Sequence, residues 1–277
     1  MVGLGGYHMA AGGERLAQQN IETALEEGIR FFDCAYKYLD GRSEEALGKF
    51  LSPKYREHAF IMSKADTRDP QIDSRIQLET SLKRMKTDYV DLWMTHTIVD
   101  SGDAERRIAE MLEVAEKAKE EGKIRYFGFT GHKATEAHLK AIEMVKGMDD
   151  VSCLMPISPV DFVSKDSFTV NVLPGLIENQ IIPLAMKTMN AGRAMSEHEG
   201  KSVIPGRLSF EENQWFVLSL PVATWVSGMQ NPDHVRQNVD IARRFTALTE
   251  ADRLAIAERV LDVKDVAGLQ PYRQWNT

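Results

Sequence analysis

The sequence contains only two cysteines, Cys34 and Cys153, among its 277 residues. They form no CxxC motif, and two cysteines are too few for a framework of disulfides. The chain therefore fits a reducing compartment better than a secreted scaffold held by disulfides. We expect both thiols to be core residues and not nucleophiles.

Long apolar segments are also absent. No apolar run approaches the ~20 residues that a membrane-spanning helix needs. The first residues, MVGLGGYHM, lack the basic segment and the long apolar segment of a signal peptide. We therefore expect a cytoplasmic protein with no membrane partner.

An excess of positive charge is the third absence. The formal net charge is −7 at pH 7 and the pI is about 5.6. The sequence thus offers no broad basic face for nucleic acid, and a few local groups must hold any bound anion. We expect small molecules as partners, and no pattern in the chain indicates an oligomeric state.

What the sequence does contain is a regular alternation of two kinds of segment. Short apolar runs rich in β-branched and aromatic residues alternate with amphipathic stretches of helical period. The predicted strands cover 2–6, 29–35, 59–65, 90–96, 124–130, 151–158, 181–188 and 223–229. The predicted helices cover 14–28, 43–51, 71–85, 104–122, 136–148, 173–180, 210–220 and 232–245.

This alternation predicts the fold. Strict βα alternation implies parallel strands, and apolar runs without a polar face imply strands that are buried on both sides. A doubly wound sheet would also satisfy the pattern, but eight nearly equal units favour closure into a parallel (β/α)8 TIM barrel with outer helices. We predict one domain over residues 1–277, with the loop 188–208 and the tail 264–277 covering the pocket.

Ionisable side chains stand at the ends of three consecutive predicted strands. The second strand ends at Asp33, with Tyr36 and Tyr38 just after it, the third at Lys64 and the fourth at His96. In such barrels the active residues lie at the carboxyl ends of the strands. A nearby cation stabilises a tyrosine's phenolate and makes the phenol a usable proton donor near neutral pH. A carboxylate would hold that cation in place.

Each of these residue types also has a structural explanation when it is taken alone. An aspartate can cap a helix, a rim lysine can keep its charge in water, and a histidine or tyrosine can simply pack in the core. Their arrival together at consecutive strand ends favours a shared site. We interpret the charged stretch 104–123 as a solvated helix face with i,i+4 pairs, and Trp93 and Trp225 as packing residues within strands.

The segment GIRFFDCAYKYLDGRSEEALGKFL, together with IMSK and YVDLWMTH, resembles the signature of the aldo-keto reductase superfamily. The resemblance covers essentially the whole barrel and implies four catalytic residues: Asp33, Tyr38, Lys64 and His96. The implied reaction transfers a hydride from a nicotinamide cofactor to the carbonyl of an aldehyde or ketone, with Tyr38 as proton donor. Lys64, paired with Asp33, would lower the pKa of Tyr38. A hydrogen bond from His96 would orient the carbonyl, and no metal is implied.

The same resemblance extends to the cofactor site. IRYFGFTGH and SGMQNPDHVRQN are similar to the family's fifth strand and to its cofactor-binding eighth strand and following helix. The implied cofactor-binding residues are Gly5, Gly6, Tyr7, Asp33, Thr130, Gly131, Met186, Lys187, Ser227, Gly228, Met229, His234, Arg236, Gln237 and Asn238.

Several of these positions depart from the family's pattern. Thr130 and Gly131 stand where relatives usually carry Ser and Asn, and Leu154 stands where a Gln is common. Met186 replaces a Tyr that stacks on the nicotinamide. The adjoining pair Met186 and Lys187 is similar to a subgroup of which some members carry an iron–sulfur domain, but two distant cysteines cannot build such a cluster.

For the cofactor we favour NADP(H), with NAD(H) as the alternative. Relatives that prefer the phosphorylated form show Lys or Arg early in the segment 227–238, where this chain has Gly228 and His234, so Arg236 is the nearest strong cation. A helix beginning at Pro232 would add free N-terminal amides. Further candidates for ligand contacts are Tyr7, His132, Trp215, Tyr272 and Trp275, and for the pyrophosphate Arg193, Lys201 and Arg207.

Two other functions stay open on the sequence alone. A metal-dependent hydrolase on the same barrel could use Asp33, His96 and His132; against it stand the lack of an HxH pair and the repulsion of a cation by Lys64. A regulatory protein could keep the barrel and the cofactor without turnover, as potassium-channel β subunits do within the superfamily.

Overall fold

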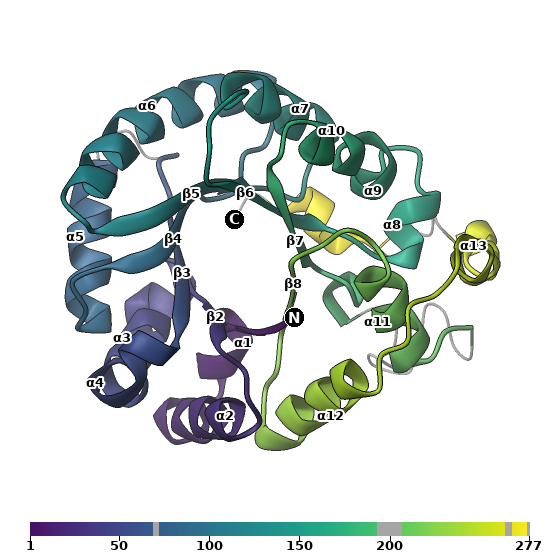
Figure 1. Cartoon of the computed structure of the whole chain (residues 1–277), viewed down its shortest axis with the longest axis horizontal. Helices are drawn as coiled ribbons and strands as arrows, with labels where there is room; N and C mark the ends of the chain where they lie inside the picture. Colours follow the sequence, from purple (N-terminus) through teal and green to yellow (C-terminus); the bar gives the residue numbers. More distant parts are fainter. Residues whose placement is uncertain (69–71, 193–206, 264–267, 276–277) are drawn as a thin grey trace.

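Eight parallel strands close into a barrel in a computed structural model that describes residues 1–68, 72–192, 207–263 and 268–275 (Figure 1). Neighbours in the chain are neighbours in the barrel, and β1 closes it against β8, where Val2 pairs with Trp225. The predicted (β/α)8 barrel is confirmed. The strands are β1 Val2–Gly5, β2 Phe31–Asp33, β3 Phe60–Ala65, β4 Val90–Thr95, β5 Ile124–Thr130, β6 Val151–Pro156, β7 Ile182–Met186 and β8 Thr224–Ser227.

Helices surround the strands, and the described residues hold more of them than the eight that the sequence predicted (Figure 1). They are α1 Gly6–Ala11, α2 Glu14–Glu26, α3 Arg42–Phe50, α4 Ser52–Tyr55, α5 Ser74–Met85, α6 Ser101–Glu120, α7 Thr135–Met144, α8 Pro159–Val163, α9 Phe168–Asn171, α10 Leu173–Glu178, α11 Phe210–Leu218, α12 Pro232–Arg243 and α13 Glu250–Glu258. The 3-10 turns are η1 Tyr38–Gly41, η2 Arg56–His58, η3 Asn190–Gly192, η4 Leu261–Val263 and η5 Pro271–Gln274.

Two of the unpredicted helices have local capping signals that the apolar period does not reveal. Ser158 accepts a hydrogen bond from the Asp161 amide at the start of α8, which also has Pro159 in its first turn. Thr249 and Asp252 form a capping box at the start of α13. A third, α1, follows β1 without a break, where the sequence predicted a loop.

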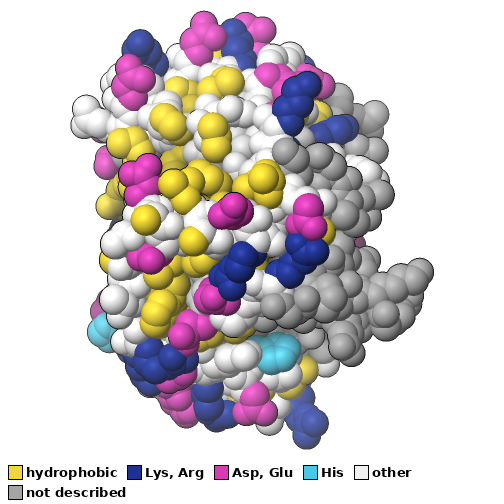
Figure 2. Space-filling model, turned by 90° about the vertical axis from the view of Figure 1, so that its right-hand side faces the viewer, with side chains coloured by type: hydrophobic (Ala, Val, Ile, Leu, Met, Phe, Trp, Pro, Cys, Tyr) yellow, Lys and Arg dark blue, Asp and Glu magenta, His cyan; other side chains and the backbone are white. Residues whose placement is uncertain are grey.

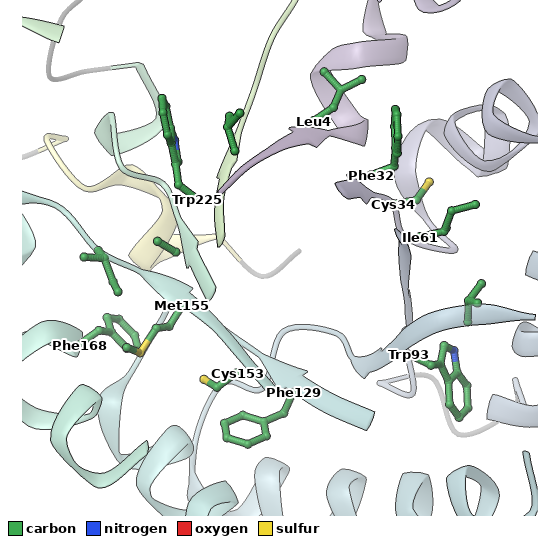
Figure 3. Packing of buried hydrophobic residues seen from close by; sticks show 14 of the residues in the cluster. Leu4, Phe32, Cys34, Ile61, Trp93, Phe129, Cys153, Met155, Phe168 and Trp225 are labelled. Carbon is green, nitrogen blue, oxygen red and sulfur yellow. The ribbon is translucent and has the colours of Figure 1, made fainter. Parts of the chain in front are cut away.

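The apolar side chains of the strands form two layers. One set points into the barrel and includes residues of six strands: Phe31, Met62, Leu92, Met94, Leu154, Leu184 and Val226. The other set points outward and packs under the helices, as Phe32, Ile61, Trp93 and Trp225 do in Figure 3. Strands buried on both faces explain the continuous apolar runs in the sequence.

The predicted core assignments of the cysteines and two tryptophans agree with this packing. Cys34 and Cys153 are free and fully buried in the outer layer. Trp93 and Trp225 are almost completely buried within β4 and β8. Among the described residues, no helix has the length and apolar character needed to cross a bilayer.

The outer surface beyond the helix layer is mixed in character. On the face that carries α13, hydrophobic side chains lie between acidic and basic ones (Figure 2). Leu254 of α13 and Leu261 of η4 are about half exposed.

One close helix contact depends on the absence of a side chain. Gly48 lies inside α3, and a Cβ atom there would overlap the backbone oxygen of Arg84 in α5. Gly175 lies inside α10, and a Cβ there would meet the Ile142 Cδ1 at an ordinary 3.5 Å.

We predict that Gly48→Ala destabilises the protein by about 1–3 kcal/mol, because α3 and α5 must move apart to admit the methyl group. Gly175→Ala, the matched control, should be neutral or stabilising by about 0.5–1 kcal/mol through its higher helix propensity. Urea unfolding followed by circular dichroism measures both. Equal midpoints for the two variants would contradict the packing constraint.

Candidate active site

The four predicted catalytic residues meet at the carboxyl-terminal mouth of the barrel. Asp33 is the last residue of β2, Lys64 lies near the end of β3, and His96 directly follows β4. Tyr38 begins the 3-10 turn η1, five residues beyond Asp33. Parallel strands in register bring these chain-distant positions to one rim.

The Lys64 ammonium is the centre of this group. It donates to the Asp33 carboxylate in a buried ion pair and to the backbone oxygen of Cys34 at 2.6 Å. Its third neighbour is the Tyr38 hydroxyl, 3.3 Å away. Three acceptors around one ammonium satisfy all its donors, which a buried lysine requires.

The start of α1, directly after β1, contributes backbone to the same site. A Cβ at Gly6 would overlap the backbone oxygen of Asp33, so only glycine allows β1 and α1 to come this close to β2. The Gly6 amide also donates to the Asp33 carboxylate, which favours its ionised form.

Burial and pairing act in opposite directions on the two charged groups. Burial raises the pKa of Asp33, whereas the Lys64 ammonium and the Gly6 amide lower it, and the net shift is upward. Burial by itself would lower the pKa of Lys64, but the Asp33 carboxylate, together with Tyr38 and Cys34, outweighs it and the pKa is raised. The lysine therefore stays an ammonium at neutral pH.

The pKa of Tyr38 corrects one expectation from the sequence. Lys64 does act to lower it, as predicted, but burial is the larger effect and raises the pKa of Tyr38 to about 12. In the free protein the side chain is therefore a neutral phenol, with a proton to give and an ammonium 3.3 Å away to stabilise the anion left behind.

His96 lies beside Tyr38 at the mouth. Their ring centroids are 5.6 Å apart in an edge arrangement. Burial lowers the pKa of His96 well below its usual value, and the Lys64 ammonium adds to this, so the imidazole is neutral. Its Nδ1 atom is buried and has no hydrogen-bond partner within the described residues.

Backbone strain is concentrated beside these side chains. Leu39 and Asp40, which follow Tyr38, have φ of 55° and 58°, and Thr97, which follows His96, has φ of 57°. Lys187 at the end of β7 has φ of 54°. The left-handed region is unfavourable for residues other than glycine, above all for a β-branched threonine, and such residues cluster at functional sites.

Other aromatic and basic groups surround the four. Tyr7, which the sequence placed in a loop, lies in α1 with its ring 5.8 Å from that of Tyr38. His132 lies beyond β5, and its ring centroid is 6.1 Å from the ring of Trp275. The Lys187 ammonium lies 4.7 Å over the same Trp275 ring. Burial lowers the pKa of Lys187 to about 8.

The C-terminal segment that carries Trp275 is held firmly to the barrel. Arg273 pairs with the buried Asp161 at 3.0 Å and with Asp166 at 3.2 Å. Tyr272 is fully buried, and its hydroxyl donates to Gln270 at 3.1 Å. Residues 264–267 and 276–277 of the predicted covering tail, and 193–206 of the predicted covering loop, lie outside the described residues.

The predicted cofactor residues on β1 and β8 lie side by side. A Cβ at Gly5 would lie 2.8 Å from the backbone oxygen of Ser227, and one at Gly228 would lie 2.5 Å from the His8 ring. His8 was not predicted from the sequence. The sequence predicted a loop around His8, which therefore gave no signal, whereas in the structure His8 lies in α1 with its ring next to Gly228.

On β5 to β7 the predicted residues have defined partners. The Thr130 hydroxyl donates to the Leu154 backbone oxygen at 2.7 Å, and Leu154 itself belongs to the inner barrel cluster. A Cβ at Gly131 would lie 2.5 Å from the backbone oxygen of Ile98. Met186 is the last residue of β7 and is partly buried against the inner cluster.

The N-terminus of α12 follows β8, and the predicted residues there differ in exposure. Asn231 caps the helix by accepting from the His234 amide at 2.9 Å. Asn238 is buried and donates to the His234 backbone oxygen at 2.7 Å, while its Oδ1 has no partner within the described residues. Arg236 is exposed and pairs with Asp233 at 3.2 Å.

The remaining members of this segment divide between core and solvent. Met229 is fully buried in the outer core layer, and Gln237 is exposed.

Three sequence expectations are corrected by these positions. Trp215 packs on the outer side of the barrel, where its Nε1 donates to the backbone oxygen of Ile241 at 3.2 Å. Arg207 pairs with Asp262 of η4. Arg107 lies in the stretch interpreted as a solvated face, yet it is fully buried. Its position on the same helical face as Ala104, Ile108 and Met111 was the signal that could have identified it. Arg193 and Lys201 lie outside the described residues.

For the metal-hydrolase alternative, the described residues contain no group of three or more His, Cys, Asp or Glu side chains placed to hold an ion. Asp33, its proposed carboxylate, is already paired with Lys64.

Comparisons with known proteins agree with this geometry. A model of the Aldo/keto reductase family matches residues 1–199. An uncharacterised oxidoreductase, YqkF, of Bacillus subtilis (strain 168) is 29% identical over 286 residues, covering 88% of each chain. L-galactose dehydrogenase of Arabidopsis thaliana is 24% identical and covers 88% of this chain and 82% of its own.

Solved structures share the fold. The holo form of aldo-keto reductase AKR11C1 from Bacillus halodurans superposes with a TM-score of 0.76 at 24% identity, covering 93% of this chain and 91% of its own. An aldo-keto reductase from Klebsiella pneumoniae in complex with NADPH superposes with a TM-score of 0.72 at 20% identity, covering 94% and 90%.

We predict that Lys64→Met lowers the free energy of unfolding by about 3–5 kcal/mol near pH 8, because it leaves the Asp33 carboxylate buried without its cation. The loss should shrink at pH 5. Without Lys64, the pKa of Asp33 in the folded state rises further above its value in the unfolded state. Between these two pKa values the folded state keeps a proton that the unfolded state has lost. The free energy of unfolding therefore falls as the pH rises through that range.

Urea unfolding at pH 5 and pH 8 tests this prediction. The double variant Lys64→Met, Asp33→Asn is the control, since it removes the titrating group and should flatten the added pH dependence. If Lys64→Met alone is equally stable at both pH values, the predicted role of the buried Lys64–Asp33 ion pair is contradicted.

Proposed function

Because the chain belongs to the aldo/keto reductase family, we propose that it is an oxidoreductase that transfers a hydride from NADPH to the carbonyl carbon of a small aldehyde or ketone. Tyr38 donates the proton that the carbonyl oxygen takes up. The observation that carries this proposal is the chain of contacts from the Tyr38 hydroxyl through the Lys64 ammonium to the Asp33 carboxylate.

Proton donation by Tyr38 depends on its two neighbours. When the phenol gives up its proton, the Lys64 ammonium at 3.3 Å stabilises the phenolate that remains. Asp33 keeps the ammonium charged and in place. Because burial has already raised the pKa of Tyr38 to about 12, the phenol holds its proton until a carbonyl oxygen gaining negative charge accepts it.

His96 would act as the second group on the carbonyl oxygen. A neutral imidazole can donate one hydrogen bond without carrying a charge into the mouth. Its ring lies 5.6 Å from that of Tyr38, in an edge arrangement, so the two side chains border the same part of the mouth. The two side chains would together fix where the carbonyl oxygen lies.

Several features of the mouth fit a nicotinamide dinucleotide. Gly5, Gly6 and Gly228 allow the backbone of β1, α1 and β8 to approach its neighbours closely at this rim. The buried Asn238 Oδ1 is without a partner in the described part of the chain, and Lys187 places an ammonium at the end of β7. When bound, the cofactor supplies the hydride.

These residues would divide the work of binding. Met186 would lie against the nicotinamide ring, Thr130 and Gly131 beside its carboxamide, and Tyr7 on the side of α1. Ser227 and the N-terminus of α12, with His234, Gln237 and Asn238, would hold the adenosine half, because free helix amides attract phosphate.

We favour NADP(H) over NAD(H) for two reasons. Aldo-keto reductases of the same fold are known in complex with NADPH and with NADP. Arg236, in the second turn of α12, is exposed and could turn from Asp233, 3.2 Å away, to a 2′-phosphate.

We predict that Tyr38→Phe lowers kcat for carbonyl reduction at least ~100-fold, since it removes the proton donor. The dissociation constant for NADPH should change little, because the dinucleotide contacts remain. A panel of aldehydes and ketones followed at 340 nm, with NADPH binding measured by fluorescence, gives both values. Unchanged turnover in the variant would exclude this role, and an inactive wild type that still binds NADPH would favour the regulatory alternative.

A second prediction concerns the cofactor. Arg236→Ala should weaken NADPH binding about fivefold, equivalent to about 1 kcal/mol, and leave NADH binding unchanged. Arg243→Ala is the matched control, because Arg243 lies in the last turn of the same helix, away from its N-terminus, although both arginines pair with Glu27, at 3.9 Å for Arg236 and 3.0 Å for Arg243. Fluorescence titration with both cofactors measures the effect. Equal affinities of the wild type for NADPH and NADH would contradict the preference.

A further inference from the structure

We propose that Arg107 is a positioning residue for His96, and that it acts by holding the strained turn that follows this histidine. Its consequence for catalysis rests on the proposed function, whereas its effect on the position of the imidazole does not.

Arg107 reaches the site from the helix layer. It lies on α6, is completely buried, and points its guanidinium at the loop between β4 and α6. One terminal nitrogen, Nη2, donates to the backbone oxygen of His96, and the other, Nη1, donates to that of Thr97 at 2.9 Å. Two successive backbone oxygens therefore converge on one guanidinium.

The rest of the guanidinium is occupied as well. Nε donates to the Thr67 hydroxyl at 2.9 Å, just beyond β3, and Nη1 also contacts the Asp103 carboxylate at 3.0 Å. Arg107 thus joins the ends of β3 and β4 to α6. Such a fork of donors cannot be reproduced by the single ammonium of a lysine.

The turn that Arg107 holds is unfavourable without it. Thr97 has φ of 57°, a left-handed conformation that is unfavourable for a β-branched residue. That conformation is what turns the oxygens of His96 and Thr97 toward the same guanidinium. Hydrogen bonds from a charged donor are stronger than those between neutral groups, so the two that Arg107 makes can hold the strained turn.

The other backbone hydrogen bonds of the turn that involve described residues are made by its amides. The His96 amide donates to the Ala65 oxygen at 2.9 Å, and the Ile98 amide donates to the Thr130 oxygen at 2.9 Å. Without the guanidinium, the two peptide planes around Thr97 could rotate toward an ordinary conformation. The Cα–Cβ bond of His96 would then change direction, and its ring would move relative to Tyr38.

A small movement is enough to affect a reaction at this site. A displacement of about 1 Å can cost about 100-fold in rate when two groups must address one oxygen atom. We therefore expect Arg107→Lys to lower kcat for carbonyl reduction tenfold or more, while the dissociation constant for NADPH stays within about twofold. Thr67→Val, which removes one acceptor and keeps the shape of the side chain, should lower kcat in the same way but by less. If Arg107→Lys does not fold, Thr67→Val carries the test.

The matched control is Arg56→Lys at the opposite end of the barrel. Arg56 is also largely buried, donates to the backbone oxygens of Ala59 and Tyr89, and pairs with Asp91 at 2.8 Å. It holds no residue of the mouth. This variant should lower the melting temperature and leave kcat unchanged, which separates a loss of stability from a loss of position.

A double-mutant cycle identifies the residue through which Arg107 acts. In a His96→Ala background the imidazole is gone, so Arg107→Lys should change kcat less than about twofold further. Multiplicative losses in the double variant would overturn the proposal, because they would show that Arg107 affects the reaction independently of His96.

A measurement that does not depend on catalytic turnover tests this proposal separately from the proposed function. The imidazole NMR signals of histidine-labelled protein can be assigned for His96 with the His96→Ala variant. Arg107→Lys should shift or broaden the His96 signal, and Arg56→Lys should not. An unmoved signal would overturn the positioning role even if carbonyls are reduced. A moved signal in a protein that reduces no carbonyl would support it and refute the proposed function alone.

Discussion

The site depends on one buried ammonium. Lys64 could not remain charged inside the barrel without the Asp33 carboxylate and the Cys34 backbone oxygen beside it. Its remaining neighbour is the Tyr38 hydroxyl. The arrangement that stabilises the buried ammonium therefore also places its positive charge next to a phenol. The fold places these groups because β1, β2 and β3 end at one rim, with Gly6 allowing the closest approach of backbone to Asp33.

A rigid barrel permits strain to accumulate at its rim. The residues that follow Tyr38, His96 and Met186 all have left-handed backbone conformations, although none of them is glycine. Each of these turns redirects the chain directly after a side chain of the mouth. Such conformations persist only where the surroundings hold them, and for the turn after His96 the surroundings include the buried guanidinium of Arg107.

The charges of the mouth suit an anionic ligand with a polar reacting group. His96 is neutral, Asp33 is neutralised by Lys64, and Lys187 adds an ammonium whose pKa burial has lowered to about 8. The protein as a whole is acidic, with a net charge of −7. Positive charge is therefore local, which is consistent with a dinucleotide held by a few groups and not by a basic surface.

The barrel could be predicted from the sequence, as could the placing of Asp33, Lys64 and His96 at strand ends, because period, length and residue type are local properties. The choice of Tyr38 over Tyr36 came from the resemblance to the family's signature. What surrounds these residues follows from the packing of the whole barrel. The pKa of Tyr38 rises instead of falling because burial, which no local pattern measures, exceeds the effect of Lys64. Likewise, in the sequence Arg107 is one of many charged residues on a predicted helix. Its role depends on which face of α6 packs against the barrel.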